Sequence, residues 1–258
     1  MALIKKFRIK KFKEQKPLLK LEKISMFYNK RQILNNLDLK INNQEILGML
    51  GPNGVGKSTI FHIITGLKNP SFGKVLIDGE DCTNIPIYER ATRFSLGYVP
   101  QYGGFIQDLT LLENFNLVGE IHIKEKDIRK SKIEKIISQF ELDPLLNIKS
   151  KYLSGGQKKK LVIGMALINE PNILLLDEPF AALDILTIKM LQEIIVNLQT
   201  LDKITVIVCD HQARDLLSCV DRAIVLSDGK IIASGSPDEI VKDSSAKLAY
   251  FGDEFKIN

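Results

Sequence analysis

The stretch Gly51-Pro52-Asn53-Gly54-Val55-Gly56-Lys57-Ser58-Thr59 decides the fold of this chain. It matches the pattern G-x-x-x-x-G-K-[ST], a loop whose backbone N–H groups converge on phosphate oxygens. Residues 45–50 before it read as a short buried strand, and apolar residues recur at helical spacing from residue 60 to 67 after it. The glycines allow a sharp backbone path, and the N-terminus of the following helix adds partial positive charge. Lys57 can then supply a cation for the β- and γ-phosphates, and the Ser58 hydroxyl can ligate Mg²⁺.

Length and composition limit the protein class. The 258 residues suit one large domain or two small lobes, and no apolar run reaches the length of a membrane-spanning helix. The hydrophobic (45%) and charged (26%) fractions are those of an ordinary globular protein, so neither a disordered nor a membrane class is indicated. Cys82, Cys209 and Cys219 are odd in number and lack the paired spacing of a metal site, which indicates reduced thiols of a cytosolic protein.

A basic head precedes the predicted globular part. Residues 1–17 carry seven Lys and Arg residues against the single acid Glu14, although the whole chain has a net charge of only +5. The head has no continuous apolar core, so it does not read as a secretion signal. Two interpretations stay open: a solvated tail, or a segment that lies on an anionic membrane surface through its interleaved apolar residues. No nucleic-acid partner is expected, because the rest of the chain contains no recognition module.

Strand patterns dominate the first hundred residues. Residues 19–24 and 37–41 alternate as half-buried antiparallel strands. Tyr28 lies between them, where its ring could stack on a base, although strand packing is the commoner reason for such a residue. A strand at 96–99 must end at the proline that follows it. Gln101 follows on the loop after this strand. It is a candidate site residue because it lies at a strand exit in a chain that has a phosphate-binding loop.

Helical patterns replace strand patterns from residue 110 onward. Thr110 and Glu113 form a helix-capping pattern, and residues 133–140 carry an apolar stripe at helical spacing. No strand pattern interrupts this stretch. We therefore expect a separate helical lobe whose apolar stripe forms its core.

A second anion-binding pattern follows the helical stretch. Ser154 can cap a helix that runs through residue 168, which leaves Gly155 and Gly156 at its N-terminus ahead of Gln157. Exposed N–H groups and a close backbone approach make such a terminus suitable for an anion. One chain has no use for two such sites on the same γ-phosphate, so the pattern predicts that a second copy presents this one.

Two apolar strand patterns end in charged or titratable side chains. Residues 172–176 run into Asp177 and Glu178, and residues 204–208 lead to His211. Continuous apolar runs suit central parallel strands that are covered on both faces. At the strand exit, Asp177 is placed to hold the Mg²⁺ shell and Glu178 to polarise a water molecule. His211 is a candidate for contacting the γ-phosphate.

Together these elements resemble the ATP-binding-cassette (ABC) family over residues 18–243. Tyr28 falls where that family places an aromatic residue that stacks on adenine. Six motifs carry the resemblance, in the family's order: Walker A (51–59), the Q-loop (Gln101), the signature (153–157), Walker B (173–178), the D-loop (181–184) and the switch histidine (His211).

The resemblance implies a fold and a domain organisation. The implied fold is an α/β P-loop NTPase of the RecA-like kind, with a mostly parallel sheet core, an antiparallel β subdomain and a small α-helical subdomain. Residues 1–17 would form a basic N-terminal extension, residues 18–250 the ATPase domain and residues 251–258 a C-terminal tail. The helical subdomain would cover about residues 102–168.

The resemblance also implies the cofactors ATP and Mg²⁺ and a role for each site residue. Glu178, His211 and Gln101 would be catalytic, and Ser58, Gln101 and Asp177 would bind the metal. ATP would be bound by Tyr28, Gly51, Pro52, Asn53, Gly54, Val55, Gly56, Lys57, Ser58 and Thr59. A second copy of the chain would contribute Ser154, Gly155, Gly156, Gln157 and Asp184 in trans.

Within the family, the short helical lobe and the ending Tyr-Phe-Gly-Asp-Glu-Phe-Lys-Ile at 250–257 are similar to the ATPases of lipopolysaccharide export. The run Asp-Glu-Pro-Phe-Ala at 177–181 fits the same group. This resemblance implies a homodimer that hydrolyses ATP to power lipopolysaccharide extraction from the inner membrane. The dimer would sit peripherally on the cytoplasmic face, on transmembrane permease subunits of the LptF and LptG type.

Two alternatives stay open. The ATPases of branched-chain amino-acid importers share much of the pattern but lack the Phe-Lys-Ile extension. A soluble cassette ATPase that acts on ribosomes or DNA would usually join two cassettes or carry a long coiled-coil insertion. Ile106-Gln107 stands where the export ATPases have Phe-Arg, and Lys158-Lys159-Lys160 replaces an arginine-rich run. These departures bear on the transported substrate and leave the expected ATPase activity unchanged.

Overall fold

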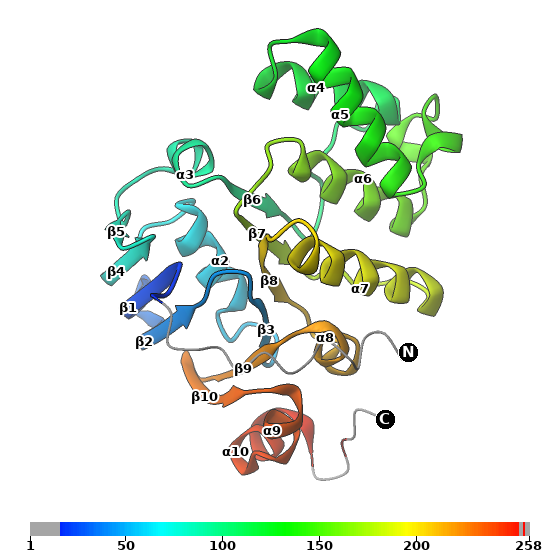
Figure 1. The fold of residues 1–258 in the computed structure, drawn as a ribbon. Helices are drawn as coiled ribbons and strands as arrows, with labels where there is room; N and C mark the ends of the chain where they lie inside the picture. The colour runs from blue at the N-terminus through cyan, green and yellow to red at the C-terminus, as the bar shows by residue number, and fades with distance from the viewer. Residues whose placement is uncertain (1–15, 253–254, 256–258) are drawn as a thin grey trace.

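The computed structural model describes residues 16–252 and Phe255 (Figure 1). Residues 1–15, which hold most of the basic head, lie outside the described residues, as do residues 253, 254 and 256–258 of the predicted tail. In the described part of the chain, no helix combines the length and the apolar character needed to cross a membrane.

A six-stranded sheet forms the centre of the structure, in the strand order β10-β9-β3-β8-β7-β6. Its strands are β3 (Ile46–Leu50), β6 (Leu96–Val99), β7 (Ile173–Asp177), β8 (Thr205–Cys209), β9 (Arg222–Ser227) and β10 (Lys230–Gly235). Neighbours pair in parallel from β9 to β6, whereas β10 forms an antiparallel hairpin with β9. Every residue of β3, β7 and β8 is buried, because both faces of these parallel strands are covered. The predicted, mostly parallel core is confirmed.

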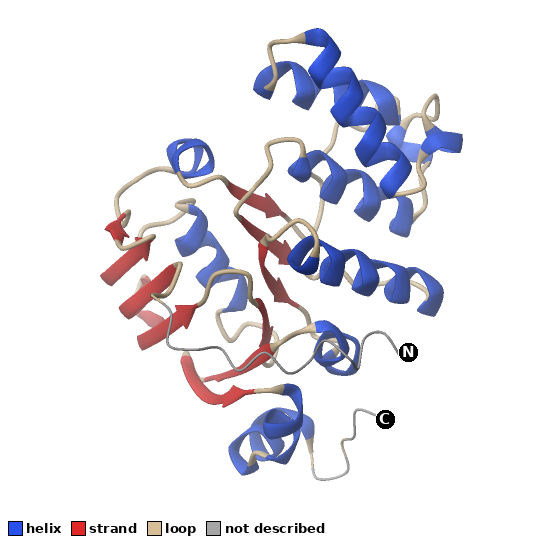
Figure 2. Cartoon of the chain, viewed as in Figure 1, coloured by secondary structure: helices blue, strands red, loops and turns tan. Residues whose placement is uncertain are grey.

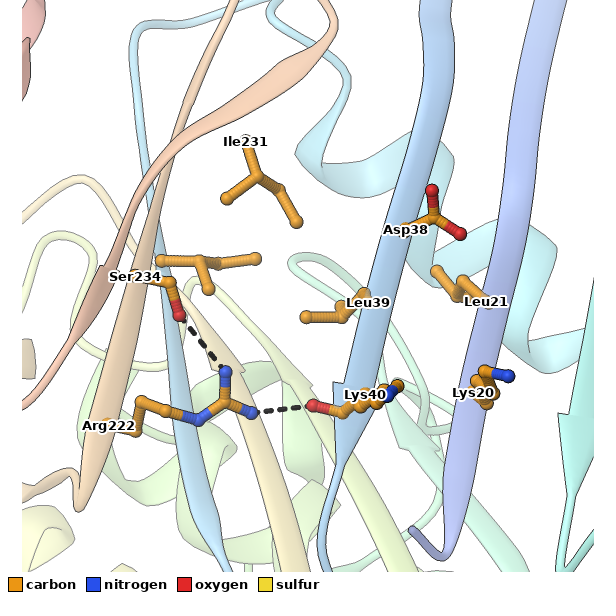
Figure 3. Close-up of a pocket in the computed structure, with 9 residues that line it drawn as sticks. Lys20, Leu21, Asp38, Leu39, Lys40, Arg222, Ile231 and Ser234 are labelled. Carbon is orange, nitrogen blue, oxygen red and sulfur yellow. Dashed lines mark hydrogen bonds between the residues drawn. The ribbon is translucent and has the colours of Figure 1, made fainter.

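A four-stranded antiparallel sheet, in the order β2-β1-β4-β5, lies beside the central sheet (Figure 2). It contains β1 (Leu19–Tyr28), β2 (Arg31–Ile41), β4 (Phe72–Ile77) and β5 (Glu80–Asp81). The antiparallel sheet was predicted, but its first two strands are longer than residues 19–24 and 37–41. They continue to a tight turn at Asn29, whose φ is 53°. Shifts in the register of the β1–β2 pair break the regular alternation that a sequence prediction depends on.

Helix α2 (Lys57–Thr65) starts directly at the phosphate-binding loop and packs between the two sheets. Its residues Ile60, Phe61, Ile63 and Ile64 are buried in one cluster with strands of both sheets. The helix ends at Gly66, which adopts the left-handed conformation with a φ of 79°. The apolar pattern is thereby confirmed as a buried helix up to residue 65, whereas Leu67 lies beyond the helix and is exposed. The helix fixes the loop between the two sheets.

The remaining helices lie around the sheets, from the top to the bottom of the view in Figure 1. The group at the top consists of α4 (Leu111–His122), α5 (Lys126–Gln139) and α6 (Gly155–Leu167), with 3₁₀ turns at Asp143–Leu145 and Ser150–Tyr152. The others are α3 (Ile87–Arg93), α7 (Ile185–Thr200), α8 (Ala213–Cys219), α9 (Pro237–Lys242), α10 (Ser244–Ala246) and a π-helical turn at Lys247–Phe251.

The buried side chains of the helical group α4–α6 form one continuous apolar cluster with the central sheet. The predicted capping box of Thr110 and Glu113 starts α4, and the predicted stripe of α5 is buried at Ile133, Ile136 and Ile137. Gly164 of α6 lets the helices approach, since a Cβ there would lie 2.9 Å from the ring of Phe115. The expected helical lobe is present, but its apolar stripe joins the core of the central sheet and does not form a core of its own.

Asn114 holds the loop that precedes α4. Its side chain is fully buried. The Oδ1 atom accepts from the backbone N–H of Ile106 at 2.8 Å, and the Nδ2 atom donates to the carbonyls of Ile106 and Thr110, both at 3.0 Å. The Nδ2 atom also lies 2.9 Å from the hydroxyl of Ser150. The partners on the loop are backbone groups of Ile106 and Thr110, so this amide holds the loop without contacting the side chains of Ile106 and Gln107.

Arg90 of α3 is a fully buried cation at the C-terminus of α2. Its Nη1 atom donates to the carbonyls of Ile63 and Ile64 at 2.7 and 2.8 Å. Its Nε and Nη2 atoms donate to the carbonyls of Ile85 and Thr83 at 2.7 and 2.9 Å. The last carbonyls of a helix lack intrahelical partners and carry partial negative charge. Arg90 therefore stabilises the end of the helix whose other end starts at the phosphate loop.

Replacing Arg90 should destabilise the fold. We expect Arg90→Met to lower the free energy of unfolding by roughly 2–4 kcal/mol, because it leaves several buried carbonyls without donors. Urea denaturation followed by circular dichroism measures the difference. Arg93→Met at the exposed end of the same helix is the matched control, and it should cost less than about 1 kcal/mol. Equal losses in the two variants would contradict this role for Arg90.

Candidate active site

The phosphate-binding loop connects the end of β3 to the start of α2, as the sequence predicted. Gly51 and Gly56 have positive φ angles of 145° and 112°, which side chains rarely tolerate. A Cβ at Gly51 would lie 2.5 Å from the carbonyl oxygen of Leu226, and one at Gly56 would lie 2.7 Å from Leu34 Cδ2. Both positions therefore require glycine for reasons of conformation and of space.

Lys57 directs its ammonium group back over this loop. The residue is 6% exposed. Its Nζ atom donates to the carbonyls of Gly51 and Pro52 at 2.6 and 3.0 Å. The cation is thus held inside the curve of the loop by backbone groups, in the position that a phosphate-binding lysine needs.

Asp177, at the end of β7, carries a buried oxygen atom without a partner. The residue is 4% exposed, and its Oδ1 atom has no hydrogen-bond donor in the structure. Tyr98 Oη donates to the Oδ2 atom at 3.4 Å. Burial, and then the charge of Glu178, raise the pKa of the Asp177 carboxyl, and hydrogen bonds from Tyr98 and Ser58 oppose that rise.

The surroundings of Asp177 fit a hard divalent cation. An unpaired buried carboxylate oxygen is costly unless a ligand compensates it, and Mg²⁺ prefers carboxylate and hydroxyl oxygens. The structure brings the predicted ligands Asp177 and Ser58 together. It places the side-chain amide of Gln101, the third predicted ligand, on Glu178 instead.

Glu178 is the point where the three predicted catalytic residues meet. Its Oε2 atom accepts from Gln101 Nε2 at 2.5 Å and lies 3.5 Å from His211 Nδ1. The backbone N–H of Glu178 donates to the carbonyl of Cys209 on β8 at 2.7 Å, and its φ is 47°. The left-handed conformation is strained for a glutamate and is held by the neighbouring strand.

Asp210 fixes the segment that carries His211. It is fully buried and accepts from the backbone N–H groups of Phe180 and Gln212, both at 2.9 Å. Burial raises the pKa of the Asp210 carboxyl, and these two hydrogen bonds oppose that rise. The carbonyl of His211 accepts a further hydrogen bond from Tyr250 Oη at 2.9 Å. The backbone around His211 is thereby held from two sides.

The residues predicted to act in trans lie at two adjacent, exposed helix N-termini. Ser154 and Gln157 form a capping box at the start of α6, and Asp184 caps α7 through the backbone N–H groups of residues 186 and 187. A Cβ at Gly156 would lie 2.5 Å from Thr187 Cγ2, so the two termini touch. In residues 16–252, no hydrogen bond or ion pair joins these termini to the loop 51–59.

Tyr28, the predicted adenine-stacking residue, is half-buried at the end of β1. The ammonium of Lys68 lies 4.6 Å from the centre of its ring. A cation on an aromatic face is a favourable contact. Stacking of adenine on Tyr28 stays a prediction.

Besides Asp210 and Tyr250, two further residues of the site were not predicted from the sequence. Tyr98 donates to Asp177, and it could have been found from its position as the last residue but one of a strand, three residues before Gln101. Lys159 of α6 donates from Nζ to the carbonyl of Gln101 at 2.9 Å. The run of three lysines at 158–160 is the sequence feature that could have indicated a contact with the site.

Comparison with known proteins gives close relatives along nearly the whole chain. A family model described as ABC transporter matches residues 34–181. The chain is 36% identical over 244 residues to the lipopolysaccharide export system ATP-binding protein LptB of Haemophilus influenzae, covering 93% of this chain and 99% of that protein. It is 32% identical to the protein of the same name from Escherichia coli K12, with coverage of 89% and 95%.

Solved structures agree with the fold. A nucleotide-free ATP-binding cassette from an ABC transporter matches with a TM-score of 0.81 and 27% identity, covering 92% of this chain and all of that one. A dimeric cassette bound to ADP and phosphate matches with a TM-score of 0.76 and 30% identity, covering 85% and 98% of the two chains.

Replacing Asp177 tests the cation site. We expect Asp177→Asn to weaken nucleotide affinity in the presence of Mg²⁺ by roughly ten- to hundredfold, the range typical for damage to a metal site. In EDTA its affinity should stay within about twofold of the unmodified protein, because the amide keeps the shape of the side chain. Fluorescent-nucleotide titration gives both values, with exposed Asp202→Asn as the control. An equal loss with and without Mg²⁺ would contradict a cation site at Asp177.

Proposed function

This chain belongs to the ABC transporter family, and we propose that it is the ATP-hydrolysing subunit of a transporter that exports lipopolysaccharide. The observation that carries the catalytic part is the meeting of Gln101 and His211 on the carboxylate of Glu178, beside the end of β7. The relatives at 32–36% identity that are named for lipopolysaccharide export support the transported substrate. They favour export over an amino-acid importer or a soluble, non-transport ATPase.

ATP is bound by the loop 51–59 in this proposal. The backbone N–H groups and the N-terminus of α2 receive the phosphates, and Lys57 contributes its charge. Lys57 would exchange its present hydrogen bonds to loop carbonyls for phosphate oxygens. Tyr28 stacks on the adenine ring.

Mg²⁺ would be held by Ser58 and Asp177, with the side-chain oxygen of Gln101 as a further ligand. Bound there, the cation neutralises charge on the β- and γ-phosphates. The unpaired Oδ1 atom of Asp177 is the feature that fits this role. Tyr98 orients the same carboxylate through its hydroxyl.

Glu178 acts as the general base for hydrolysis. Its carboxylate takes a proton from a water molecule while the water oxygen attacks the γ-phosphorus and ADP leaves, a contribution worth about 10²–10⁴ in rate. Gln101 orients the carboxylate through the observed hydrogen bond. His211 lies on the same oxygen and stabilises charge on the transferred phosphoryl group.

A second copy completes each site. Ser154, Gly155 and Asp184 are exposed, Gly156 and Gln157 are half-buried, and within the described residues none of the five is hydrogen-bonded to the loop of its own chain. A head-to-tail dimer would place these helix N-termini on the nucleotide held by the partner's loop. The dimeric relative bound to ADP and phosphate supports this arrangement.

The dimer would work on the cytoplasmic face of the inner membrane, with permease subunits of the LptF and LptG type as membrane partners. ATP binding closes the dimer and hydrolysis opens it, and this movement is transmitted to the permease docked on the helical group α4–α6. The substrate contacts then lie in the permease, and this chain supplies the free energy.

Replacing the proposed base should separate nucleotide binding from turnover. We expect Glu178→Gln to bind ATP within about threefold of the unmodified affinity and to hydrolyse it at least about a hundredfold more slowly, because the amide cannot take a proton. Nucleotide titration and a phosphate-release assay measure the two quantities. Size-exclusion chromatography should show a dimer that forms only with ATP.

Exposed Glu193→Gln on α7 is the matched control and should hydrolyse normally. A Glu178→Gln protein with unchanged turnover would remove Glu178 from the role of base.

A membrane purification tests the transported substrate. Detergent extracts of membranes should yield this chain together with transmembrane permease subunits, and purified lipopolysaccharide should raise the ATPase rate of that complex by roughly twofold or more, since a ligand shifts the population of competent states. Mass spectrometry identifies the partners, and phosphate release measures the rate. An amino-acid permease as partner, with stimulation by leucine instead, would overturn the export function. Recovery without any membrane protein would favour the soluble class.

A further inference from the structure

Lys159 is a half-buried cation that the proposed mechanism does not use. It lies on α6 one turn after Ser154, and its Nζ atom donates to the backbone carbonyl of Gln101 at 2.9 Å. Its neighbour Lys160 has a conventional acidic partner, since its Nζ atom lies 3.7 Å from Glu141. Lys159 instead extends from α6, the helix that follows the signature motif, toward the active site of its own chain.

The acids of the active site partly compensate the burial of the Lys159 ammonium. Burial lowers the pKa of the Lys159 ammonium, and the charges of Asp210, Asp177 and Glu178 oppose that change. These acids come from the ends of β7 and β8, whereas the ammonium comes from α6. The attraction therefore acts between the helical group and the central sheet, and it is strengthened by the low dielectric constant of a buried site.

Three functional segments meet around this lysine. A cavity of about 260 Å³ is lined by Gln101 after β6, by Lys159 of α6 and by residues 181–183 before α7. At the N-terminus of α6, a Cβ at Gly155 would lie 3.4 Å from Leu183 Cδ2. The Q-loop, the signature helix and the D-loop are thus packed together within one chain.

Gln101 connects Lys159 to the proposed base. Its backbone carbonyl accepts from Lys159, and its side-chain amide donates to Glu178 Oε2 at 2.5 Å. Two hydrogen bonds and one residue therefore separate α6 from the carboxylate. A displacement of α6 would move the Gln101 backbone and with it the amide that orients Glu178.

We propose that Lys159 is a positioning residue that orients Glu178 according to the position of α6. The inference rests on the proposed function, in which the N-terminus of α6 binds the nucleotide held by the other copy. Nucleotide bound at the partner's loop then holds α6 in one position. Lys159 and Gln101 transmit that position to Glu178, the base of this chain's own site. Helix α6 has two positions in this proposal, docked on the partner's nucleotide or released from it. ATP binding at one site of the dimer therefore promotes hydrolysis at the other.

The experiment compares four full-length variants: Lys159→Met, Lys159→Arg, the control Lys160→Met and Ser154→Arg. Methionine keeps most of the volume of lysine and removes the charge and the donor, and arginine restores both. Lys160→Met breaks an ion pair on the same helix without touching Gln101. Phosphate release is measured over a range of ATP concentrations for kcat, the half-saturating concentration and the Hill coefficient.

Lys159→Met should lower kcat roughly tenfold, a loss typical for one misplaced catalytic hydrogen bond, with less than about a twofold change in half-saturating ATP. Its Hill coefficient should fall toward about 1 from a value above about 1.5 for the unmodified dimer. Lys159→Arg should recover to within about threefold of the unmodified kcat. In a Glu178→Gln background, Lys159→Met should still form the ATP-dependent dimer, because ATP binding is intact.

Several outcomes would overturn the inference. Lys159→Met with unchanged kcat and Hill coefficient would do so, and so would an equal loss in Lys160→Met, since helix packing would then explain both. Failure of Lys159→Arg to recover any activity also contradicts a positioning cation. The Ser154→Arg variant identifies a different failure: if it hydrolyses ATP normally, the shared site itself is wrong. If it is inactive while Lys159→Met is normal, only the role of Lys159 is wrong.

Discussion

The parallel strands β3, β7 and β8 end at the same edge of the central sheet, and the rest of the site depends on that shared edge. Asp177, the last residue of β7, pairs with Cys209 at the end of β8, so the acids at 177, 178 and 210 emerge side by side. Strand β3 pairs with the other side of β8 and leads into the loop that carries Lys57. Ligands of open α/β sheets bind outside the carboxyl ends of the strands for this reason. The topology therefore brings together residues that are more than a hundred positions apart in the sequence.

Concentrating acids at one edge costs free energy. Burial raises the pKa of both the Asp177 and the Asp210 carboxyls, which means that their charged forms are destabilised. Two backbone N–H groups compensate Asp210, and Lys159 contributes positive charge from α6. The Oδ1 atom of Asp177 stays uncompensated. The chain alone leaves this part of its electrostatics incomplete, as functional sites commonly do.

The features that depend on neighbours in sequence could be predicted. The glycines of the phosphate loop, the capping boxes at Thr110 and Ser154, and the apolar strand before Asp177 are local patterns with a single physical reading. The contacts of Arg90 and Lys159 could not be predicted, because they join residues 27 and 58 positions apart and depend on strand order and helix packing. The same holds for Tyr98, which reaches Asp177 only because β6 and β7 are neighbours. The functional roles of the site residues remain predictions, although the geometry places Gln101, Glu178 and His211 together.

The hydrogen bonds of Asn114 affect which positions of the loop before α4 can vary. Its amide holds the loop before α4 through backbone atoms of Ile106 and Thr110, so these hydrogen bonds do not depend on the side chains at positions 106 and 107. Ile106 is 48% exposed, and Gln107 follows it on the same loop. Substitutions at these two positions should therefore cost little folding stability. If the membrane subunit of the proposed transporter docks here, the contact surface can change while the fold and the ATP site stay the same.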